Sequence, residues 1–351
     1  MEKPEIVRQS FLRQAQSCDD LGSPFTARLC KLAAARLEDD TAVGKYVLRW
    51  TGDPAGTGDA LALRLAGSLH ALVLSGRAPS LAAAYPPHTI DDDALWAACE
   101  AAFREHEGFI LERLKSAPQT NEVRRSAALL PGFLTIAALT GKPLVLSEIG
   151  VSAGLNLQWD RYRYRLGNSL WGPDSTVVLE PDWQGDAPPA ADLSVLDRAG
   201  CDLNPLDPSA AADRLRLESY IWADQKDRLE RIRNALEIAR SNSLTVERAD
   251  AIDWLRRRLA SRFRGAVHVI YHTIAWQYLS DALKEEGETL IRKAGREASN
   301  DAPIARLQLE ADGKPDGAAL TLEIWPSGER QEIGRADFHG RWIKWQGWAG
   351  L

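Results

Sequence analysis

Apolar residues in the first 140 positions recur at the spacing of helix faces. Ser23-Pro24 is typical of a helix N-cap followed by proline in the first turn. Apolar stripes predict further helices over 59–75 and 91–106, and no segment before Lys142 alternates as a half-buried strand does. The pattern therefore predicts an N-terminal helical cap domain over residues 1–118.

From Pro143 onward, short apolar runs alternate with amphipathic segments. The predicted strands cover 144–148, 162–166, 176–180, 195–202, a run that ends at Asp250, 266–271, 305–311, 320–325 and 333–345. The predicted helices cover 210–241, 254–259 and 277–298. Strands that alternate with helices indicate a mostly parallel sheet with helices on both faces. We therefore predict an α/β domain over 119–351, with an excursion of antiparallel strands over about 162–192 and a terminal antiparallel hairpin.

The segment 144–156, Leu-Val-Leu-Ser-Glu-Ile-Gly-Val-Ser-Ala-Gly-Leu-Asn, is the strongest candidate for a functional site. Glu148 ends a predicted buried strand, and an acid there is costly unless it meets a ligand or a partner. Gly150, Ser152 and Gly154 then open a predicted helix. Glycines allow a sharp turn and close approach of a ligand, and a helix N-terminus offers free N–H groups. This order predicts a nucleotide-like ligand at the carboxyl end of the first parallel strand.

The block resembles the first motif of class I S-adenosylmethionine-dependent methyltransferases, in which an acidic residue begins a glycine-rich loop. Gly200–Pro205 and Glu247–Trp254 resemble the second and third motifs of that superfamily. The resemblance implies that Glu148 and the loop hold the amino-acid and ribose parts of the cofactor. It also implies that Asp202 binds the ribose hydroxyls and Asp250 the adenine. The implied cofactor-binding residues are Glu148, Gly150, Ser152, Gly154, Asn156, Asp202 and Asp250.

The same resemblance implies a fold and a reaction. The fold is a Rossmann-like, class I methyltransferase-type sheet, mostly parallel with a terminal antiparallel hairpin. It follows a helical domain and carries a β-hairpin insertion. The reaction is methyl transfer from S-adenosylmethionine to an unknown small or medium-sized acceptor. The protein would mainly hold the methyl group in line with the acceptor atom.

The acceptor side of the predicted site begins at the strand and turn over 267–273, where that superfamily places substrate and catalytic groups. His272 is the candidate general base, and a buried structural histidine is the alternative. Further candidates are Tyr271, Gln277, Gln119, Asn121 and Glu122. The last three precede an apolar helix, so they fit a capping segment or, alternatively, a segment that folds over the cofactor loop.

The position of the second acidic residue depends on the excursion. Asp202 follows Glu148 by 54 positions, whereas about 20 residues separate the glycine loop from this acid in a Rossmann-type unit. The segment 162–192 would account for the excess. If that segment belonged to the main sheet, Glu180 would be the second acid instead. We favour Asp202.

Other enzyme and binding classes also fit parts of the block. Gly150-Val-Ser-Ala-Gly154 matches the G-x-S-x-G elbow of serine hydrolases, with Ser152 as nucleophile and Asp250 and His272 as possible partners. That fold needs strands upstream of the elbow, where this sequence is helical. A nicotinamide oxidoreductase is less favoured, because serine replaces the middle glycine of the G-x-G-x-x-G loop. A non-catalytic relative that binds a nucleoside or a protein partner is the third class.

Three further segments extend a second resemblance over most of the chain. They are Gln119–Val123, Trp222–Gln225 and Trp276–Leu279. Together with the glycine block, they are similar to an uncharacterised bacterial family known only as a domain of unknown function. This resemblance implies a bacterial cytoplasmic protein and no particular reaction.

Composition narrows the function classes further. The chain has 351 residues, of which 45% are hydrophobic and 26% charged, with a formal net charge of −6. These values fit a globular protein and give no basic surface for nucleic acid or an anionic membrane. The four cysteines are far apart without a C-x-x-C pair, so we expect no metal site and a reducing cytoplasm. The apolar stretches are too short for a membrane span and no signal peptide begins the chain, so we expect a soluble protein with a small-molecule substrate.

Overall fold

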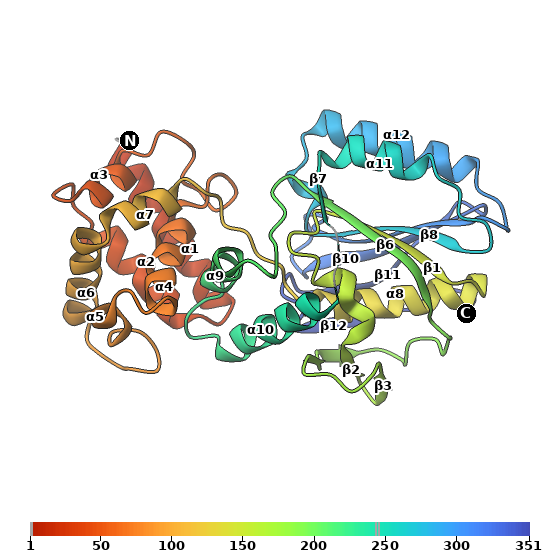
Figure 1. The fold of residues 1–351 in the computed structure, drawn as a ribbon, viewed down its shortest axis with the longest axis horizontal. Helices are drawn as coiled ribbons and strands as arrows, with labels where there is room; N and C mark the ends of the chain where they lie inside the picture. The colour runs from red at the N-terminus through yellow and green to blue at the C-terminus, as the bar shows by residue number, and fades with distance from the viewer. Residues whose placement is uncertain (1–2, 243, 245) are drawn as a thin grey trace. The chain divides into compact units, whose positions relative to one another are not determined.

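The computed structural model describes residues 3–242, 244 and 246–351, and it divides the chain into two compact units (Figure 1). Unit 1 contains the residues up to Thr120 together with Ser209–Glu230, and unit 2 contains Asn121–Pro208 and Arg231–Leu351. The predicted division after residue 118 falls close to the first of these boundaries. The return of 209–230 to unit 1 was not predicted, because no local pattern in that segment names its packing partner.

Unit 1 is helical throughout its described part. Its helices are α1 (Lys3–Asp20), α2 (Pro24–Arg36), α3 (Ala42–Leu48), α4 (Leu61–Leu74), α5 (Pro79–Ala82), α6 (Asp92–Glu105), α7 (Glu107–Leu114), α9 (Ala211–Ser219) and the start of α10 (Lys226–Ser241). The predicted helices at Pro24, 59–75 and 91–106 are confirmed. Ser23 caps α2 and Asp91 caps α6, each by accepting a backbone N–H three residues later.

The single helix predicted over 210–241 is wrong, because Tyr220–Gln225 separates α9 from α10. Within this break the Asp224 carboxylate accepts hydrogen bonds from the Ser23 hydroxyl and from the backbone N–H of Phe25 (2.8 Å). The interruption therefore supplies a second cap for the N-terminus of α2, whose first N–H groups have no partner inside the helix.

Unit 2 is an α/β structure built around a nine-stranded sheet, as predicted at this coarse level. Its helices are α8 (Arg125–Thr140), η1 (Asn156–Arg161), α10, α11 (Ala251–Leu259), η2 (Trp276–Tyr278) and α12 (Asp281–Arg296). The sheet contains β1 (Leu144–Ile149), β5 (Asp182–Gln184), β6 (Val195–Asp202), β7 (Val246–Arg248), β8 (Val267–Thr273), β9 (Ile304–Glu310), β10 (Ala318–Trp325), β11 (Glu329–Ala336) and β12 (Trp342–Trp345). The strands lie in the order β5-β12-β11-β10-β9-β8-β1-β6-β7.

The five strands from β7 to β9 are parallel, and β10 and β11 form the predicted antiparallel hairpin. In chain order the parallel strands lie third, second, first, fourth, fifth across the sheet, which is the order of doubly wound dinucleotide-binding folds. All six residues of β1 are buried, as expected for a central parallel strand that is covered on both faces.

The two faces of the sheet carry different helices. Helix α8 contacts η1, β9 and β10 on one face, while α11 and α12 contact each other over the opposite face (Figure 1). On the α8 face, Phe133 stacks on Trp159 with 4.5 Å between ring centroids and meets Tyr271 edge to face. On the other face, Ile252, Leu255 and other apolar side chains pack under Ile291 of α12. Alternate residues of β1 and β8 therefore enter different cores.

Two of the strand predictions need correction. In the excursion, β2 (Arg163–Leu166) pairs antiparallel with β3 (Ser169–Trp171) but parallel with β4 (Val178–Leu179). Strand β5 then leaves the excursion and pairs with β12 at the edge of the main sheet. The last predicted strand, 333–345, is divided between β11 and β12 by a turn in which the Asp337 side chain accepts the backbone N–H of Arg341. The pairing of β5 with β12 joins segments that are far apart in the sequence, so local patterns do not predict it.

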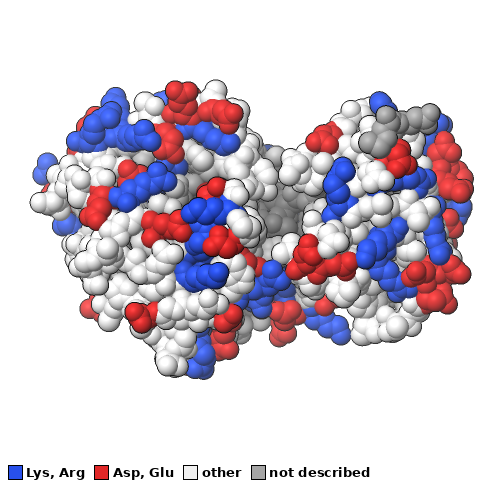
Figure 2. Space-filling model, turned by 180° about the vertical axis from the view of Figure 1, so that it is seen from behind, with Lys and Arg blue, Asp and Glu red and all other residues white. Residues whose placement is uncertain are grey.

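The described residues include no helix that is both long enough and apolar enough to cross a bilayer. On the face shown in Figure 2, basic and acidic side chains are interspersed rather than separated into fields of one sign.

Candidate functional site

The strand order changes direction at β1. The next parallel strand in the chain, β6, pairs with one side of β1, and β8 pairs with the other side. In open parallel sheets, ligands bind outside the carboxyl ends of the strands at such a switch point. We call the loop 150–155, the loop 274–280 and the ends of β6 and β7 the carboxyl edge.

Two strained loops meet at the carboxyl edge. Gly150 (φ +69°) and Ser152 (φ +54°) lie in the left-handed region after β1, and Ile274 (φ +50°) does so after β8. A β-branched residue in this region is a genuine outlier, and such strain collects at functional sites. A Cβ added to Gly150 would lie 2.6 Å from the Cβ of Ala275, so the loops are in direct contact. The structure thus supports the prediction of a special conformation in the glycine block.

The glycine loop does not, however, present free amides to a ligand. The N–H groups of Gly150 and Val151 donate to the Cys201 carbonyl at 3.0 and 3.1 Å, and Ser152 N donates to Asp202 Oδ2 at 2.9 Å. The next three N–H groups donate to Asn121 Oδ1, to the Val151 carbonyl and again to Asn121 Oδ1. All six amides from 150 to 155 are therefore satisfied within unit 2. Of the two alternatives for the upstream segment, Asn121 does fold onto the loop.

The α-helix expected after the glycine loop is also absent. The segment that follows is the six-residue 3-10 helix η1. The Tyr162 hydroxyl donates to the Leu155 carbonyl and the Tyr164 hydroxyl donates to the Trp159 carbonyl, each at 2.6 Å. These hydroxyls occupy carbonyls that a longer helix would pair internally, and the chain turns into β2 instead. The Asn156 side-chain oxygen accepts a hydrogen bond from the Ser126 hydroxyl at 2.8 Å.

The predicted acids at the ends of β6 and β7 lie side by side. Asp202 Oδ1 accepts from Asn204 N at 2.8 Å, and the carbonyl of Asp202 accepts from Ala249 N at 3.1 Å. Asp250 Oδ1 caps α11 by accepting the N–H groups of Ile252 and Asp253. The rival acid, Glu180, lies in the excursion and pairs with Arg165. Asp202 is therefore the acid that ends the strand next to β1.

Glu148 lies inside the core on the α8 face. Its side chain is 2% exposed, and its Oε2 accepts a hydrogen bond from the Tyr271 hydroxyl at 3.1 Å. Burial raises the pKa of Glu148 well above its ordinary value, the nearby Asp202 charge raises it further, and the Tyr271 hydrogen bond opposes both. Glu148 and Tyr271 were predicted on opposite sides of the site, and the structure brings them together beneath the glycine loop.

We expect Glu148→Gln to stabilise the protein at neutral pH while leaving it unchanged at pH 4. A carboxyl whose pKa is raised on folding costs stability as the pH rises above its unfolded value near 4.5, because the native state must keep the proton or bury the charge. Each tenfold difference in proton affinity between the native and unfolded states corresponds to about 1.4 kcal/mol of unfolding free energy. The amide oxygen of the introduced glutamine can still accept the hydrogen bond from the Tyr271 hydroxyl. Urea unfolding at both pH values measures this, with the exposed Glu180→Gln as control. Equal stabilisation at both pH values would contradict a raised pKa of Glu148 in the native state.

His272 does not face the carboxyl edge. Its ring is fully buried on the α12 face, where Nδ1 donates to Glu310 Oε1 at 2.7 Å and Nε2 accepts from Arg306 at 3.3 Å. This tautomer follows from the partners, since a carboxylate only accepts and a guanidinium only donates. Burial lowers the pKa of the ring. Both nitrogens are occupied, so the predicted general base is instead a structural histidine.

The His272 network positions the strained loop. Glu310 Oε1 also accepts the N–H groups of Ala275 and Trp276, at 2.9 and 3.0 Å. The Trp276 ring stacks on the His272 ring. The Arg306 guanidinium makes a cation–π contact with the same Trp276 ring, 4.7 Å from its centroid. Sequence reasoning missed Glu310 and Arg306 because both lie on β9, more than 30 positions after His272.

The remaining acceptor-side candidates differ in burial. Gln277 is exposed, and Gln119 is half-buried. Glu122 is buried and accepts the backbone N–H of Arg124 at 3.2 Å, as a capping residue does. The exposed aromatic side chain of the loop is Tyr278, which is 77% exposed and was not predicted.

The serine-elbow interpretation lacks a base. The conformation of Ser152 is strained, as an elbow serine is. Within the described residues, however, its buried Oγ has no hydrogen-bond partner, and a nucleophilic serine needs a base within hydrogen-bond reach. Both nitrogens of His272 bind residues on the α12 face instead.

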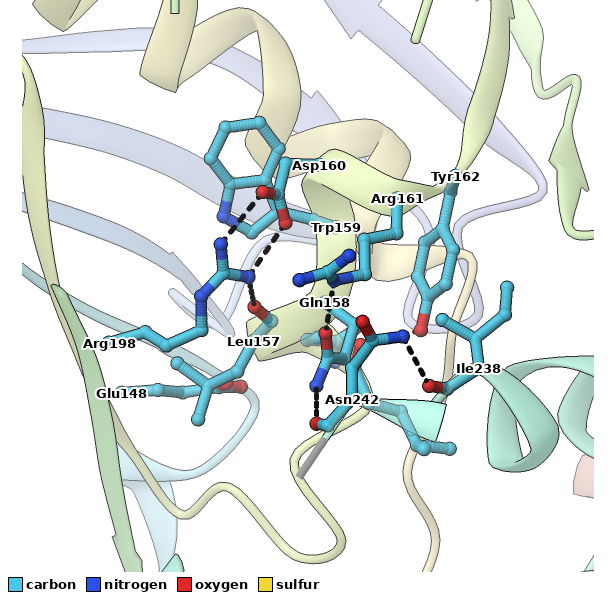
Figure 3. A network of polar contacts seen from close by, with 12 residues as sticks. Glu148, Leu157, Gln158, Trp159, Asp160, Arg161, Tyr162, Arg198, Ile238 and Asn242 are labelled. Atoms are coloured by element: carbon cyan, nitrogen blue, oxygen red, sulfur yellow. Dashed lines mark hydrogen bonds and ion pairs between the residues drawn. The ribbon is translucent and has the colours of Figure 1, made fainter. Parts of the chain in front are cut away.

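A pocket of about 530 Å³ lies elsewhere in unit 2, beside the amino-terminal half of β6. We call it the edge groove. It is lined by Gln158, Arg161, Val195–Ala199, Asn242 and Leu244, and Figure 3 shows its polar contacts. Nothing in the sequence analysis indicated these residues, because η1 and β6 lie far apart in the chain.

A family model described as "Uncharacterized protein conserved in bacteria (DUF2332)" matches residues 8–345. Comparison with curated proteins and with solved structures gave no match. The predicted similarity to an uncharacterised bacterial family is confirmed, and the methyltransferase resemblance stays a prediction.

Proposed function

Since the chain belongs to this bacterial family, whose description names no activity, we propose a function from the geometry of unit 2. It is an S-adenosylmethionine-dependent methyltransferase that binds the cofactor at the carboxyl edge. One observation carries the proposal: the glycine block follows the central strand of a sheet in doubly wound order, at the switch point beside β8. Nucleoside cofactors bind in this position of such sheets.

The acids at the carboxyl edge retain the acceptor capacity that a nucleoside needs. Each carboxylate oxygen can accept two hydrogen bonds, and each oxygen of Asp202 accepts one from the protein. Two vicinal ribose hydroxyls would use the remaining positions. Asp250 uses only Oδ1 for its cap among the described residues, which leaves Oδ2 for an adenine amino group. Leu203, the residue after Asp202, is 64% exposed and offers an apolar surface for the base.

The glycine loop contributes shape and one hydroxyl rather than backbone amides. Because its amides are bound to Cys201, Asp202 and Asn121, the loop is rigid before a ligand arrives, which lowers the entropic cost of binding. Leaving the Ser152 hydroxyl buried without a partner costs about 1–3 kcal/mol. A bound ligand that hydrogen-bonds Ser152 would remove that cost.

The residues at the site favour an acceptor that needs no protein base. A bound sulfonium supplies an activated methyl group, and the protein supplies proximity and alignment. The described loop 274–280 carries no histidine or carboxylate side chain, and Asp281 follows it at the start of α12. His272 is occupied. An amine or a thiolate that arrives deprotonated fits this site better than an alcohol.

We expect millimolar S-adenosylhomocysteine to raise the melting temperature, with NAD as the comparison ligand. Saturation at one hundred times the dissociation constant adds about 2.7 kcal/mol, or roughly 5 °C or more for a unit of this size. Asp250→Asn keeps the cap but loses the free oxygen, and Leu203→Ser loses the apolar surface, so each should reduce the shift.

The matched control is Leu170→Ser on β3, an exposed leucine outside the carboxyl edge. It should leave the shift intact. A protein that melts at the same temperature with and without S-adenosylhomocysteine would refute the cofactor assignment. Equal shifts in Leu203→Ser, Asp250→Asn and the wild type would place the ligand elsewhere.

A further inference from the structure

Unit 1 contains two neighbouring arginines that lack a carboxylate partner. Arg113 on α7 and Arg216 on α9 are half-buried, yet no carboxylate of the described chain lies within ion-pair distance of either. The shortage is local, since Arg28 and Arg104 of the same unit each pair with an aspartate. A charge that is partly removed from water normally has an opposite partner, because its lost hydration is costly. We call Arg113 and Arg216 the arginine pair.

The arginine pair converges on the end of α9. Both α7 and α9 pack against α4. Arg113 Nη2 donates to the Ser219 hydroxyl at 2.5 Å, and the Arg113 guanidinium carbon lies 6.0 Å from the centroid of the Tyr220 ring. Arg216 Nη2 donates to the Ala117 carbonyl at 3.3 Å. Burial raises the pKa of Tyr220, and the charges of both arginines oppose this rise, so both guanidinium groups lie near its hydroxyl.

The arginine pair is held in place and keeps unused donors. The Arg113 guanidinium makes cation–π contacts with Phe109, at 5.7 Å, and with Tyr220. Among the described residues, the buried Nε of each arginine has no hydrogen-bond partner, and each Nη1 and the Tyr220 hydroxyl donate to no protein group. Burial lowers the pKa of Arg113, Tyr220 opposes this, and the Arg216 charge lowers it further. Two oriented positive charges are therefore uncompensated within the described chain.

We propose that the arginine pair binds the dianionic group of a phosphate monoester, with the Tyr220 hydroxyl as a third donor. Guanidinium groups match phosphate oxygens in geometry, and each can donate two parallel hydrogen bonds. Two cations balance the charge that a phosphate monoester carries above about pH 6, whereas a single carboxylate would leave one of them uncompensated. The ligand is a small phosphorylated molecule or free phosphate. The site shares no residue with the carboxyl edge, so it does not depend on the proposed function.

Calorimetric titration of the full-length protein with phenyl phosphate and phenyl sulfate at pH 7.5 tests the proposal. The two probes share a ring and a tetrahedral oxyanion, but the sulfate ester carries a single negative charge. We expect phenyl phosphate to bind about tenfold tighter, because the second charge strengthens the hydrogen bonds from the arginine pair. Arg216→Gln should abolish this preference. Arg13→Gln, which removes an exposed arginine of α1, is the matched control and should keep it.

Two milder variants keep the test decisive if Arg216→Gln does not fold. Arg216→Lys keeps the charge but loses the two-pronged geometry, so it should weaken phenyl phosphate less than the glutamine variant does. Tyr220→Phe keeps the ring that Arg113 contacts and loses the hydroxyl, so it should weaken phenyl phosphate about fivefold. Unchanged phenyl phosphate binding in both milder variants would overturn the proposal.

Hydrogen exchange locates the bound anion. Phenyl phosphate should slow the exchange of amides within 216–220, and unchanged exchange there would place the ligand elsewhere and overturn the proposal. Equal dissociation constants for the two probes, no binding at 10-fold the millimolar range, or a preference that survives Arg216→Gln would do so as well. Within a confirmed site, inorganic phosphate that binds as tightly as phenyl phosphate would identify free phosphate as the ligand. Weaker binding of inorganic phosphate would identify an ester.

Discussion

Acidification from pH 6.5 to about 3 should destabilise unit 2 by on the order of 5 kcal/mol through His268 alone. The ring is 3% exposed, and its Nε2 accepts from the Ser147 hydroxyl at 2.8 Å, which itself accepts from Arg258 at 2.9 Å. Burial lowers the pKa of His268 to about 3, the Arg258 and Arg262 charges lower it too, and Asp197 opposes them. Between these pH values His268 is protonated in the unfolded chain but neutral in the native state. The free energy of unfolding therefore rises with pH across this window, and the contribution of His268 is fully present above pH 6.5.

His268→Gln checks this origin, because the amide oxygen can replace Nε2 as acceptor and does not titrate. Urea unfolding at several pH values between 4 and 7.5 should show a much smaller loss for the variant than for the wild type. His88→Gln, at an exposed position in unit 1, controls for the loss of a histidine. If His268→Gln lost as much stability on acidification as the wild type, another group would have to carry the effect.

Gly150→Ala should lower the free energy of unfolding by about 3 kcal/mol. The left-handed backbone costs a residue with a Cβ about 1–2 kcal/mol, and overpacking adds about 1–3 kcal/mol. The new Cβ would lie 2.6 Å from that of Ala275, on a loop that Glu310 holds in place. The loop cannot move without breaking these hydrogen bonds. Urea unfolding followed by tryptophan fluorescence measures the loss.

Gly141→Ala is the matched control, since Gly141 has nearly the same backbone conformation (φ +62°) but no atom within 4 Å of an added Cβ. Gly141→Ala should lower the free energy of unfolding only by the cost of placing a residue with a Cβ in the left-handed backbone conformation. The difference between the two variants then reports the contact between the loops at the carboxyl edge. A Gly150→Ala protein as stable as Gly141→Ala would show that the loops separate easily. Under the proposed function, the S-adenosylhomocysteine shift should vanish only in Gly150→Ala.

Local patterns predicted the elements whose formation depends on local physics. The helix start at Ser23 follows from a side chain that caps a following N–H group. The helix predicted over 254–259 begins three residues earlier, after the cap at Asp250. The strands that became β1 and β8 follow from short apolar runs that need burial on both faces. The mostly parallel sheet followed as well, because strands that alternate with helices favour parallel pairing. The order of the strands came from the structure.

Pairing between distant segments could not be predicted in the same way. The 209–230 segment returns to unit 1, where Asp224 caps a helix that starts some 200 positions earlier. Strand β5 joins the far edge of the main sheet beside β12. Both results depend on partners that no local pattern names.

At the candidate site, the sequence by itself determined that a buried strand ends in an acid and leads into a glycine loop. It favoured Asp202 over Glu180 as the second acid and placed Asp250 after a further strand. Only the tertiary structure decided what these groups bind. His272 lies on the α12 face because Glu310 and Arg306 of β9 meet it there. The loop amides are satisfied because β6 and Asn121 reach them. A buried polar group takes whichever partner the packing brings within hydrogen-bond distance, and that choice is made between elements rather than along the chain.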